Sequence, residues 1–199
     1  MSEFWEEAFQ SKGSMWGSSP TSAALQSAKA FAEAGYSKVL IPGIGYGRNA
    51  QPFLEKGMQV TGIEISETAI ALAKNQYHES LKIYHGSVTD MPFDKDRYDG
   101  IFAHALIHLL DQHARQKFIA NCFSQLEKNG MMIFTAITKR ASTYGCGSPV
   151  GQDRFEQFGG VKIFFYDLNS IEREFKSFGL TTVEEVMENY PFYLIRCKK

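Results

Sequence analysis

Between an irregular first stretch of twenty residues and residue 138, apolar and polar positions follow a strand–helix–strand rhythm. Short apolar runs bounded by glycine or turn residues predict buried strands, and apolar residues three or four positions apart predict amphipathic helices. Strands are predicted over 38–43, 58–64, 81–86, 98–106 and 129–138, and helices over 21–34, 50–57, 67–76 and 111–126. Helices between successive strands imply right-handed crossovers, and hence a parallel sheet covered on both faces.

The rhythm changes after residue 138. Residues 139–160 are rich in glycine and serine and show no clear period, so we interpret them as a loop insertion or lid. A capped amphipathic helix is predicted over 167–179. Two strands are predicted over 180–189 and 191–199, and their short connection favours antiparallel pairing. The first twenty residues hold both tryptophans and are interpreted as an N-terminal arm.

Length and composition narrow the class of protein. The chain is expected to be a single α/β domain over 1–199, with 44% hydrophobic and 22% charged residues, as is typical of globular domains. Its net charge of −1 argues against a broad nucleic-acid-binding surface. No apolar run approaches the roughly 20 residues that cross a bilayer, and the N-terminus lacks a signal-peptide pattern. Cys122, Cys146 and Cys197 form no CxxC pair, so a cytoplasmic location without a disulfide framework is expected.

Alternating glycines follow the first predicted strand, and an acidic residue ends the second. Gly43, Gly45 and Gly47 stand in VLIPGIGYG, and Glu64 closes VTGIE 21 positions after Gly43. Glycines allow a tight turn and the close approach of a ligand to the backbone. A carboxylate at the neighbouring strand end can accept hydrogen bonds from the two hydroxyls of a ribose. The sequence therefore predicts a nucleoside pocket.

The spacing of the glycines narrows the choice of nucleoside-containing ligand. Dinucleotide-binding folds use G-x-G-x-x-G, whereas here the third glycine comes one residue earlier. A pyrophosphate favours the longer turn over the helix N-terminus, so the shorter spacing favours a ligand without phosphate, such as S-adenosylmethionine. An NAD-linked oxidoreductase and a non-catalytic nucleoside-binding module are the alternative interpretations.

Four segments, in order, resemble the motifs of the class I S-adenosylmethionine-dependent methyltransferases. VLIPGIGYG resembles their first motif, VTGIEIS the second, HGSVTDMPF the adenine segment and YDGIFAHALIHLL the fourth-strand segment. The resemblance, from about Val39 to Thr138, implies a Rossmann-like three-layer sandwich with a seven-stranded, mostly parallel sheet whose last strand is antiparallel. It also implies an enzyme that transfers a methyl group to a small molecule by in-line displacement and leaves S-adenosylhomocysteine. The cofactor-binding residues that it implies are Gly43, Gly45, Tyr46, Gly47, Arg48, Glu64, Ile65, Ser87, Val88 and Ala103.

Two positions depart from the family pattern. Ile41 stands where an acid usually precedes the first glycine by two residues and often helps to hold the methionine ammonium, so another group must do this. Ser87 replaces the acid of the adenine segment, and a serine hydroxyl binds the adenine edge less strongly than a carboxylate. Asp90 either serves instead or, as we interpret it, caps the next turn. Locally, the Pro-Gly pair and GIEIS resemble the thiopurine and thiol methyltransferases, and GRNA resembles the tellurite-resistance type.

Two histidines near the end of the fourth predicted strand are candidates for contact with the methyl acceptor. His104 is the candidate catalytic base if the acceptor carries its proton at neutral pH. His108 is a candidate substrate-binding residue, or alternatively packs under the following helix. Their spacing also occurs in metal sites, but no third ligand stands nearby and no metal is predicted. Trp16 in the arm and Tyr144 in segment 139–160 are expected to line the acceptor pocket.

The sequence leaves the acceptor itself open. Because no added substrate domain is evident and the charge disfavours tRNA or DNA, a small-molecule acceptor is expected, with neither nucleic acid nor membrane as partner. Oxygen, nitrogen, sulfur and tellurium all remain open as the accepting atom. Neither the use of a general base nor the oligomeric state follows from the sequence.

Overall fold

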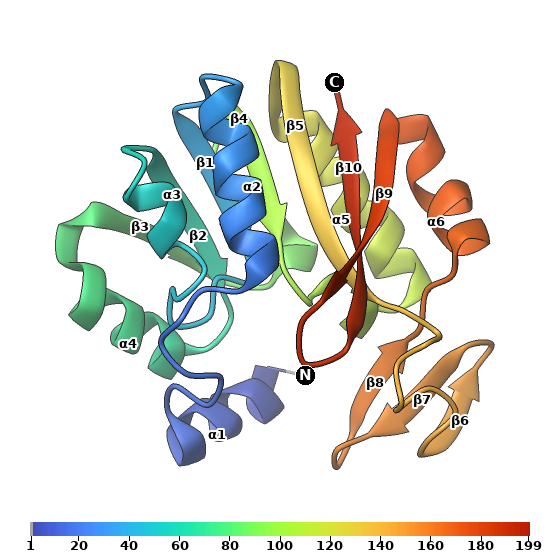
Figure 1. Ribbon diagram of the computed structural model, residues 1–199. Coiled ribbons are helices and arrows are strands. Elements are labelled where there is room, and N and C mark those ends of the chain that lie inside the picture. Colours follow the sequence, from blue (N-terminus) through green and yellow to red (C-terminus); the bar gives the residue numbers. More distant parts are fainter. Residues whose placement is uncertain (1) are drawn as a thin grey trace.

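The computed structural model describes residues 2–199 and is built around one large sheet (Figure 1). The order of its seven strands is β3-β2-β1-β4-β5-β10-β9. They are β1 (Lys38–Pro42), β2 (Gln59–Glu64), β3 (Leu81–His85), β4 (Tyr98–Ala103), β5 (Leu126–Ile137), β9 (Leu180–Met187) and β10 (Pro191–Lys198). The pairs from β3 to β5 are parallel, whereas β10 is antiparallel to both of its neighbours. The predicted mostly parallel sheet with an antiparallel last strand is confirmed.

Helices cover both faces of the sheet, which confirms the three-layer sandwich (Figure 1). One face carries α2 (Ser22–Glu33), α3 (Gln51–Leu54) and α4 (Glu67–Tyr77), and the other carries α5 (Gln112–Gln125) and α6 (Leu168–Phe175). Thr21, Ser66 and Asp111 begin α2, α4 and α5, because each side-chain oxygen accepts a backbone N–H of the first turn. Short 3₁₀ turns lie at His78–Ser80, Val88–Asp90, Ile107–Leu109 and Lys176–Phe178.

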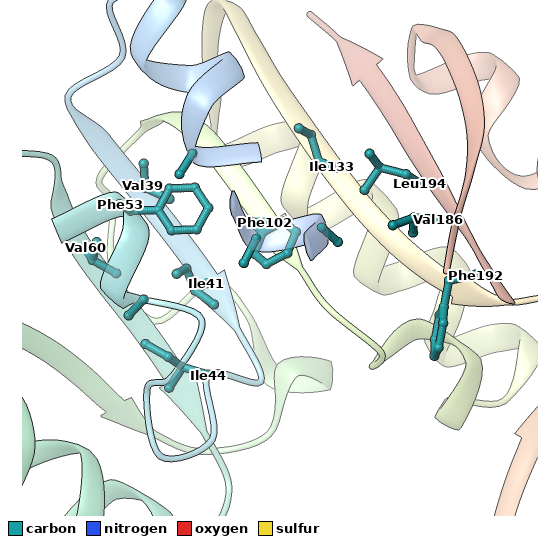
Figure 2. Close-up of a cluster of buried hydrophobic side chains, with 14 of the residues drawn as sticks. Val39, Ile41, Ile44, Phe53, Val60, Phe102, Ile133, Val186, Phe192 and Leu194 are labelled. Atoms are coloured by element: carbon teal, nitrogen blue, oxygen red, sulfur yellow. The ribbon is translucent and has the colours of Figure 1, made fainter. Parts of the chain in front are cut away.

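The strands supply a hydrophobic core on each face. Val39 and Ile41 of β1 face α2 and α3 and pack with Phe53 (Figure 2). Leu40, between them, faces the other side and belongs to the core that includes Phe118 of α5. Successive side chains of a strand point to opposite faces, so a strand buried on both sides must be apolar throughout. This explains the continuous apolar runs from which the strands were predicted.

Two segments differ from the prediction. The arm contains α1 (Ser2–Lys12), and the segment interpreted as a loop contains β6 (Ser148–Gly151) and β7 (Arg154–Gln157), which form a three-stranded antiparallel sheet with β8 (Val161–Phe164). β6 and β7 have only four residues each and β6 is exposed throughout, so they leave no alternating pattern in the sequence. α1 and the small sheet lie at the same end of the main sheet (Figure 1).

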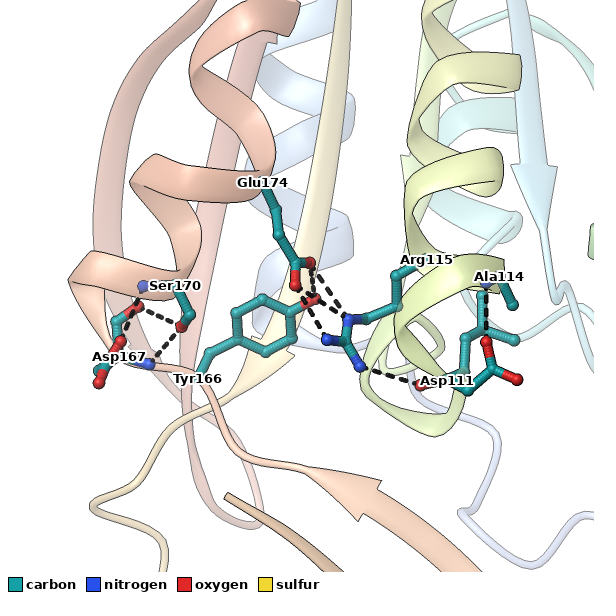
Figure 3. Close-up of polar contacts among 8 residues, drawn as sticks. Asp111, Ala114, Arg115, Tyr166, Asp167, Ser170 and Glu174 are labelled. Carbon is teal, nitrogen blue, oxygen red and sulfur yellow. Dashed lines mark hydrogen bonds and ion pairs between the residues drawn. The ribbon is translucent and has the colours of Figure 1, made fainter. Parts of the chain in front are cut away.

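A buried ion pair joins α5 to α6 (Figure 3). Nη2 of Arg115 donates to Glu174 at 2.9 Å, and both side chains are only 4% exposed. The Tyr166 hydroxyl donates to the same carboxylate at 2.8 Å, and the guanidinium lies 4.0 Å from the centre of the Phe164 ring. Phe164 ends β8, so this cluster also holds the small sheet against the α5 side. The partners of both charges offset the cost of burying them.

Removal of one partner of this pair should destabilise the fold strongly. Glu174→Ala leaves the Arg115 guanidinium buried without a countercharge, and we expect the free energy of unfolding to fall by about 3–5 kcal/mol. The double variant Arg115→Met/Glu174→Leu should recover most of this loss, because no charge stays buried. Urea unfolding followed by circular dichroism measures both. Glu172→Ala, on the exposed side of α6, is the control and should lie within about 0.5 kcal/mol of the parent protein; equal stability of the Glu174→Ala and control variants would contradict the assignment.

Candidate functional site

A cavity of about 850 Å³ lies at the carboxyl ends of β1, β2 and β4. Its walls are the loops after these strands, the arm with α1, the small sheet and the β9–β10 turn. Ligands of open α/β sheets bind at this end, and the volume lies within the range of small-molecule sites, about 300–1,000 Å³. The predicted site residues that line the cavity are Trp16, Gly43, Gly45, Tyr46, Arg48, Glu64, Ile65, Ser87, Val88, His104 and His108.

The Glu64 carboxylate joins the glycine loop to the end of β2. The Gly45 N–H donates to Oε2 at 2.8 Å, and the N–H groups of Ile65 and Ser66 donate to Oε1 at 2.8 and 3.0 Å. Glu64 is only 6% exposed. Backbone donors therefore fix this carboxylate at the cavity wall, beside the glycine loop.

The glycines of the loop serve different purposes. Gly45 has φ +58°, and a Cβ there would meet only the Phe9 ring, at 3.8 Å, so a side chain would enter the space above the loop. At Gly47 a Cβ would lie 2.7 Å from Tyr77 of α4. Gly45 therefore keeps the cavity open, whereas Gly47 lets the loop pack against α4.

Three predicted residues do not line the cavity. Gly47 faces α4, and Ala103 is fully buried in the core on the α5 face. Tyr144 donates its hydroxyl to Asp153 at 2.7 Å and packs against the small sheet. Thr143 reaches the cavity in place of Tyr144.

The segment after β3 forms a tight turn at the cavity edge. The Thr89 N–H donates to the Ser87 hydroxyl at 3.2 Å, and the two hydroxyls lie 2.8 Å apart. Ser87 and Thr89 line the cavity, whereas Asp90 is exposed and does not. Ser87, rather than Asp90, therefore caps this turn, and Asp90 takes neither of the two roles considered for it from the sequence.

The arm is bound to the glycine loop through Tyr46 and Arg48. The Tyr46 hydroxyl accepts the Trp16 N–H at 3.1 Å and donates to the Gly17 carbonyl at 2.7 Å. The rings of Trp16 and Tyr46 stack with centroids 6.2 Å apart, and Arg48 donates to the Trp16 carbonyl at 2.7 Å. Two residues predicted only for cofactor binding therefore also position the arm.

Glu6 of α1 binds the turn that follows Glu64, a contact that sequence reasoning missed. Its carboxylate accepts the hydroxyls of Ser66 and Thr68 at 2.6 and 2.5 Å and the Thr68 N–H at 3.2 Å. These hydrogen bonds, at the N-terminus of α4, lower the pKa of Glu6 to about 2. The same turn thus carries Glu64 and holds the arm.

Both histidines lie beside the cavity in neutral form. Nδ1 of His104 lies 2.9 Å from the Thr135 hydroxyl, whose oxygen already accepts the Ala105 N–H. The Thr135 hydroxyl has no other hydrogen-bond acceptor among residues 2–199, so its proton is directed at Nδ1, and we assign the ring proton to Nε2. His108 accepts the Ile137 N–H at Nδ1 through a long bond of 3.5 Å, which gives the same tautomer. Burial lowers the pKa of each histidine to about 3.

Across residues 2–199, no three His, Cys, Asp or Glu side chains gather in a way that would hold a metal ion. The helices in this part of the chain include none with the length and apolar character needed to span a bilayer.

The glycine loop, the carboxylate on the adjacent strand and the antiparallel last strand together define a nucleoside-binding domain of the methyltransferase type. Residues 40–134 match the family model described as "Methyltransferase domain". Over these residues, just under half of the chain, the predicted resemblance to the class I S-adenosylmethionine-dependent methyltransferases is confirmed.

Similar proteins agree with this placement. The chain is 31% identical over 110 residues to a ubiquinone biosynthesis O-methyltransferase of Rhodopseudomonas palustris (strain HaA2). The aligned region covers 54% of this chain and 42% of that protein. The chain thus matches less than half the length of this relative. A similar solved structure is that of Burkholderia thailandensis 1,6-didemethyltoxoflavin-N1-methyltransferase with 1,6-didemethyltoxoflavin and S-adenosylhomocysteine bound. Its TM-score is 0.78 at 16% identity, and the alignment covers 100% of this chain and 86% of that chain. TehB from Haemophilus influenzae has a TM-score of 0.66 at 17% identity, and the alignment covers 87% of this chain and 61% of that chain. At these identities the structural likeness shows the fold alone.

Loss of the Glu6 contacts should release the arm. Both tryptophans of the chain, Trp5 and Trp16, lie in the arm, so their fluorescence reports its position. We expect Glu6→Gln to shift the tryptophan emission to longer wavelength, because weaker hydrogen bonds to the α4 turn let water reach both rings. The exposed neighbour variant Glu7→Gln should match the parent protein, and identical spectra for the two variants would refute the role of Glu6.

Since the pKa of Glu6 is lowered from 4.5 to about 2, these contacts stabilise docking of the arm above pH 4.5 and are lost as the pH falls toward 2.

The buried histidines predict a loss of stability in acid. Between pH 6.5 and 3 the unfolded chain binds more protons at these positions than the folded chain, so the free energy of unfolding falls as the pH is lowered through this range. His108→Gln removes one of the two groups and should make that decrease shallower between pH 6.5 and 5. Urea unfolding at a series of pH values measures the slope, with the exposed His113→Gln as control. A slope equal to that of the control would show that His108 is not held neutral by burial.

Proposed function

We propose that this protein transfers a methyl group from S-adenosylmethionine to a small-molecule acceptor. The observation that carries the proposal is the Glu64 carboxylate, fixed at the cavity wall by three backbone N–H groups beside a glycine loop. A carboxylate held in this way suits a ribose diol, and the missing side chain at Gly45 leaves room above the loop.

The order of the strands suggests how the cofactor lies. Ser87 and Val88 follow β3 and would contact the adenine, Glu64 ends β2 and would hold the ribose, and the loop after β1 would support the methionine end. Arg48 lines the cavity at that loop and is suited to the methionine carboxylate, because its guanidinium has donors beyond its bond to the Trp16 carbonyl. The proposed cofactor-binding residues are Gly43, Gly45, Tyr46, Arg48, Glu64, Ile65, Ser87 and Val88.

When bound, S-adenosylmethionine supplies a methyl carbon to which the acceptor's lone pair bonds, while the electrons of the breaking carbon–sulfur bond pass to sulfur. The chain's own contribution is alignment and exclusion of water, from the arm on one side and the small sheet on the other. Trp16 and Thr143 would contact the acceptor from these two sides, and Tyr144 would support Thr143 from outside the cavity.

His104 and His108 are proposed to orient the acceptor. A histidine whose pKa is about 3 is a weak base at neutral pH, and the hydrogen bonds of both residues place the proton on Nε2. We therefore propose that His104 acts as a hydrogen-bond donor to the acceptor, in place of the general base considered from the sequence. An acceptor proton, where there is one, would then leave to solvent when the methylated product is released.

The alternative of an NAD-linked oxidoreductase is less well supported. After the glycine loop the chain forms only the four-residue turn α3, which is too short to offer a pyrophosphate the aligned N–H groups of a long helix. The cavity also continues past the nucleoside loops to His104 and His108, which provides space for an acceptor and favours an enzyme over a binding module.

Glu64→Gln should weaken S-adenosylmethionine binding by about 1–3 kcal/mol, because a charged hydrogen-bond acceptor for the ribose is lost. Isothermal calorimetry with S-adenosylmethionine and with NAD measures affinity, and release of S-adenosylhomocysteine with a panel of small thiols, phenols and amines measures turnover. Glu67→Gln, exposed on the first turn of α4, is the matched control and should bind as the parent protein does. Unchanged affinity of Glu64→Gln would reject the ribose assignment, and tighter binding of NAD than of S-adenosylmethionine would reject the proposed function.

A further inference from the structure

Beyond the loops that follow β1, β2 and β3, the cavity continues along a wall formed by β5, the small sheet and β10. We call this surface the acceptor wall. It consists of Ile137, Phe158, Val161, Ile163, Tyr190 and Phe192. Aliphatic and aromatic side chains make up nearly all of it, so its favourable interactions are those of burying apolar surface.

The charged side chains that line the cavity either lie away from the acceptor wall or already have a hydrogen-bond partner. Among the described residues they are Lys12, Arg48, Glu64 and Glu188. Arg48 and Glu64 belong to the cofactor end, and Lys12 is the last residue of α1, a helix that lies apart from the small sheet (Figure 1). Glu188, in the β9–β10 turn, accepts the Ala23 N–H at 2.8 Å and so caps α2. A carboxylate or phosphate placed against the acceptor wall would lose its hydration without gaining a countercharge, and an ammonium would meet only the Glu188 carboxylate, one oxygen of which already accepts the Ala23 N–H.

The acceptor wall nevertheless adjoins specific polar groups. The Phe192 ring lies 5.9 Å from that of His104 and 5.8 Å from that of His108, so the two imidazoles flank the apolar surface. Within residues 2–199 neither Nε2 has a hydrogen-bond partner, and both residues line the cavity. The Thr143 hydroxyl oxygen is buried at the same end, also without a partner in that part of the chain. These are neutral groups that can bind a neutral polar atom.

We propose that the methyl acceptor is an uncharged, mainly apolar molecule that presents a carbonyl oxygen or ring nitrogen to the Nε2–H groups of His104 and His108. The inference rests on the proposed function, which requires an acceptor in this cavity. It goes further by naming the substrate class: the apolar wall selects against charged acceptors, and the imidazole donors select for a hydrogen-bond acceptor on the substrate.

The test compares naphthalenes of one shape, added to the protein saturated with S-adenosylhomocysteine, with binding measured by equilibrium dialysis. 2-Acetylnaphthalene carries a neutral carbonyl, 2-naphthoate a negative charge, 1-(2-naphthyl)ethylamine a positive charge, and 2-isopropenylnaphthalene no hydrogen-bond acceptor. We expect the acetyl compound to bind about tenfold or more tightly than either charged compound, because neutral donors without a free countercharge do not make up for the lost hydration of a full charge. It should bind about fivefold more tightly than the isopropenyl compound, because only the acetyl group accepts a hydrogen bond. Equal or tighter binding of a charged compound, or no binding of the acetyl compound, overturns the inference.

Two variants locate the effect. His104→Phe keeps an aromatic ring against Phe192 but removes the donor, and should at least halve the preference for the acetyl over the isopropenyl compound. Val161→Lys places a cation at the partly exposed edge of the acceptor wall and should shift the preference toward 2-naphthoate. The exposed variant His113→Phe is the control and should leave all the ratios unchanged. Unaltered ratios in both test variants would contradict the assignment of this wall.

Binding of S-adenosylhomocysteine, measured for each protein by calorimetry, separates two kinds of failure. If it binds while the acetyl compound does not, the proposed substrate class is wrong and the methyltransferase function stands. If S-adenosylhomocysteine itself does not bind the parent protein, the proposed function and the inference that rests on it both fail.

Discussion

The hydrogen bonds that Glu64 accepts from the backbone are the interaction on which the cavity depends. The parallel pairing of Pro42 with Ile63 brings the ends of β1 and β2 together, so the carboxylate can reach Gly45 directly. A carboxylate that is 6% exposed is stable only where donors replace water, and the loop after β1 and the turn before α4 supply them. The position of the acid and the shape of the glycine loop therefore depend on each other.

The arm depends on the same junction. Ser66 donates its N–H to Glu64 and its hydroxyl to Glu6, so one residue links the strand end to α1. Trp16 then reaches the far side of the glycine loop and stacks on Tyr46. The part of the chain that covers the cavity is thus attached to both loops that would hold the cofactor. A ligand that orders these loops would also favour the docked arm, because they share hydrogen-bond partners.

Local signals were enough to predict the main sheet and the residues that gather at the cavity beside the glycine loop. Buried parallel strands need continuous apolar runs, and the loop at Gly45 needs glycine, so both features are written into neighbouring residues. Contacts between distant segments were not predictable in this way. Glu6 and Ser66 are sixty positions apart, and nothing near either residue indicates the pairing. Phe4, Trp5, Ala8 and Phe9 do have helical spacing, so α1 itself left a signal that the glycines and serines after it obscured.

The direction of a side chain at a strand end was equally beyond local reasoning. Ala103 and His104 are adjacent, yet Ala103 is buried in the core while His104 lines the cavity, because successive residues of a strand point to opposite faces. Likewise Thr143 reaches the cavity while Tyr144 supports the small sheet.

The register of the sheet also decides the chemistry of the acceptor end. β4 and β5 pair Ala103 with Phe134, which brings Thr135 beside His104. Since the Thr135 hydroxyl has no other acceptor among residues 2–199, its proton can satisfy Nδ1, and the imidazole is left as a donor through Nε2. An apolar residue at position 135 would leave Nδ1 without this partner and the tautomer undetermined. Strand pairing, far from any ligand contact, thus selects a neutral donor over a base at this point, and the apolar surroundings of Phe192 keep it neutral by excluding water from the ring.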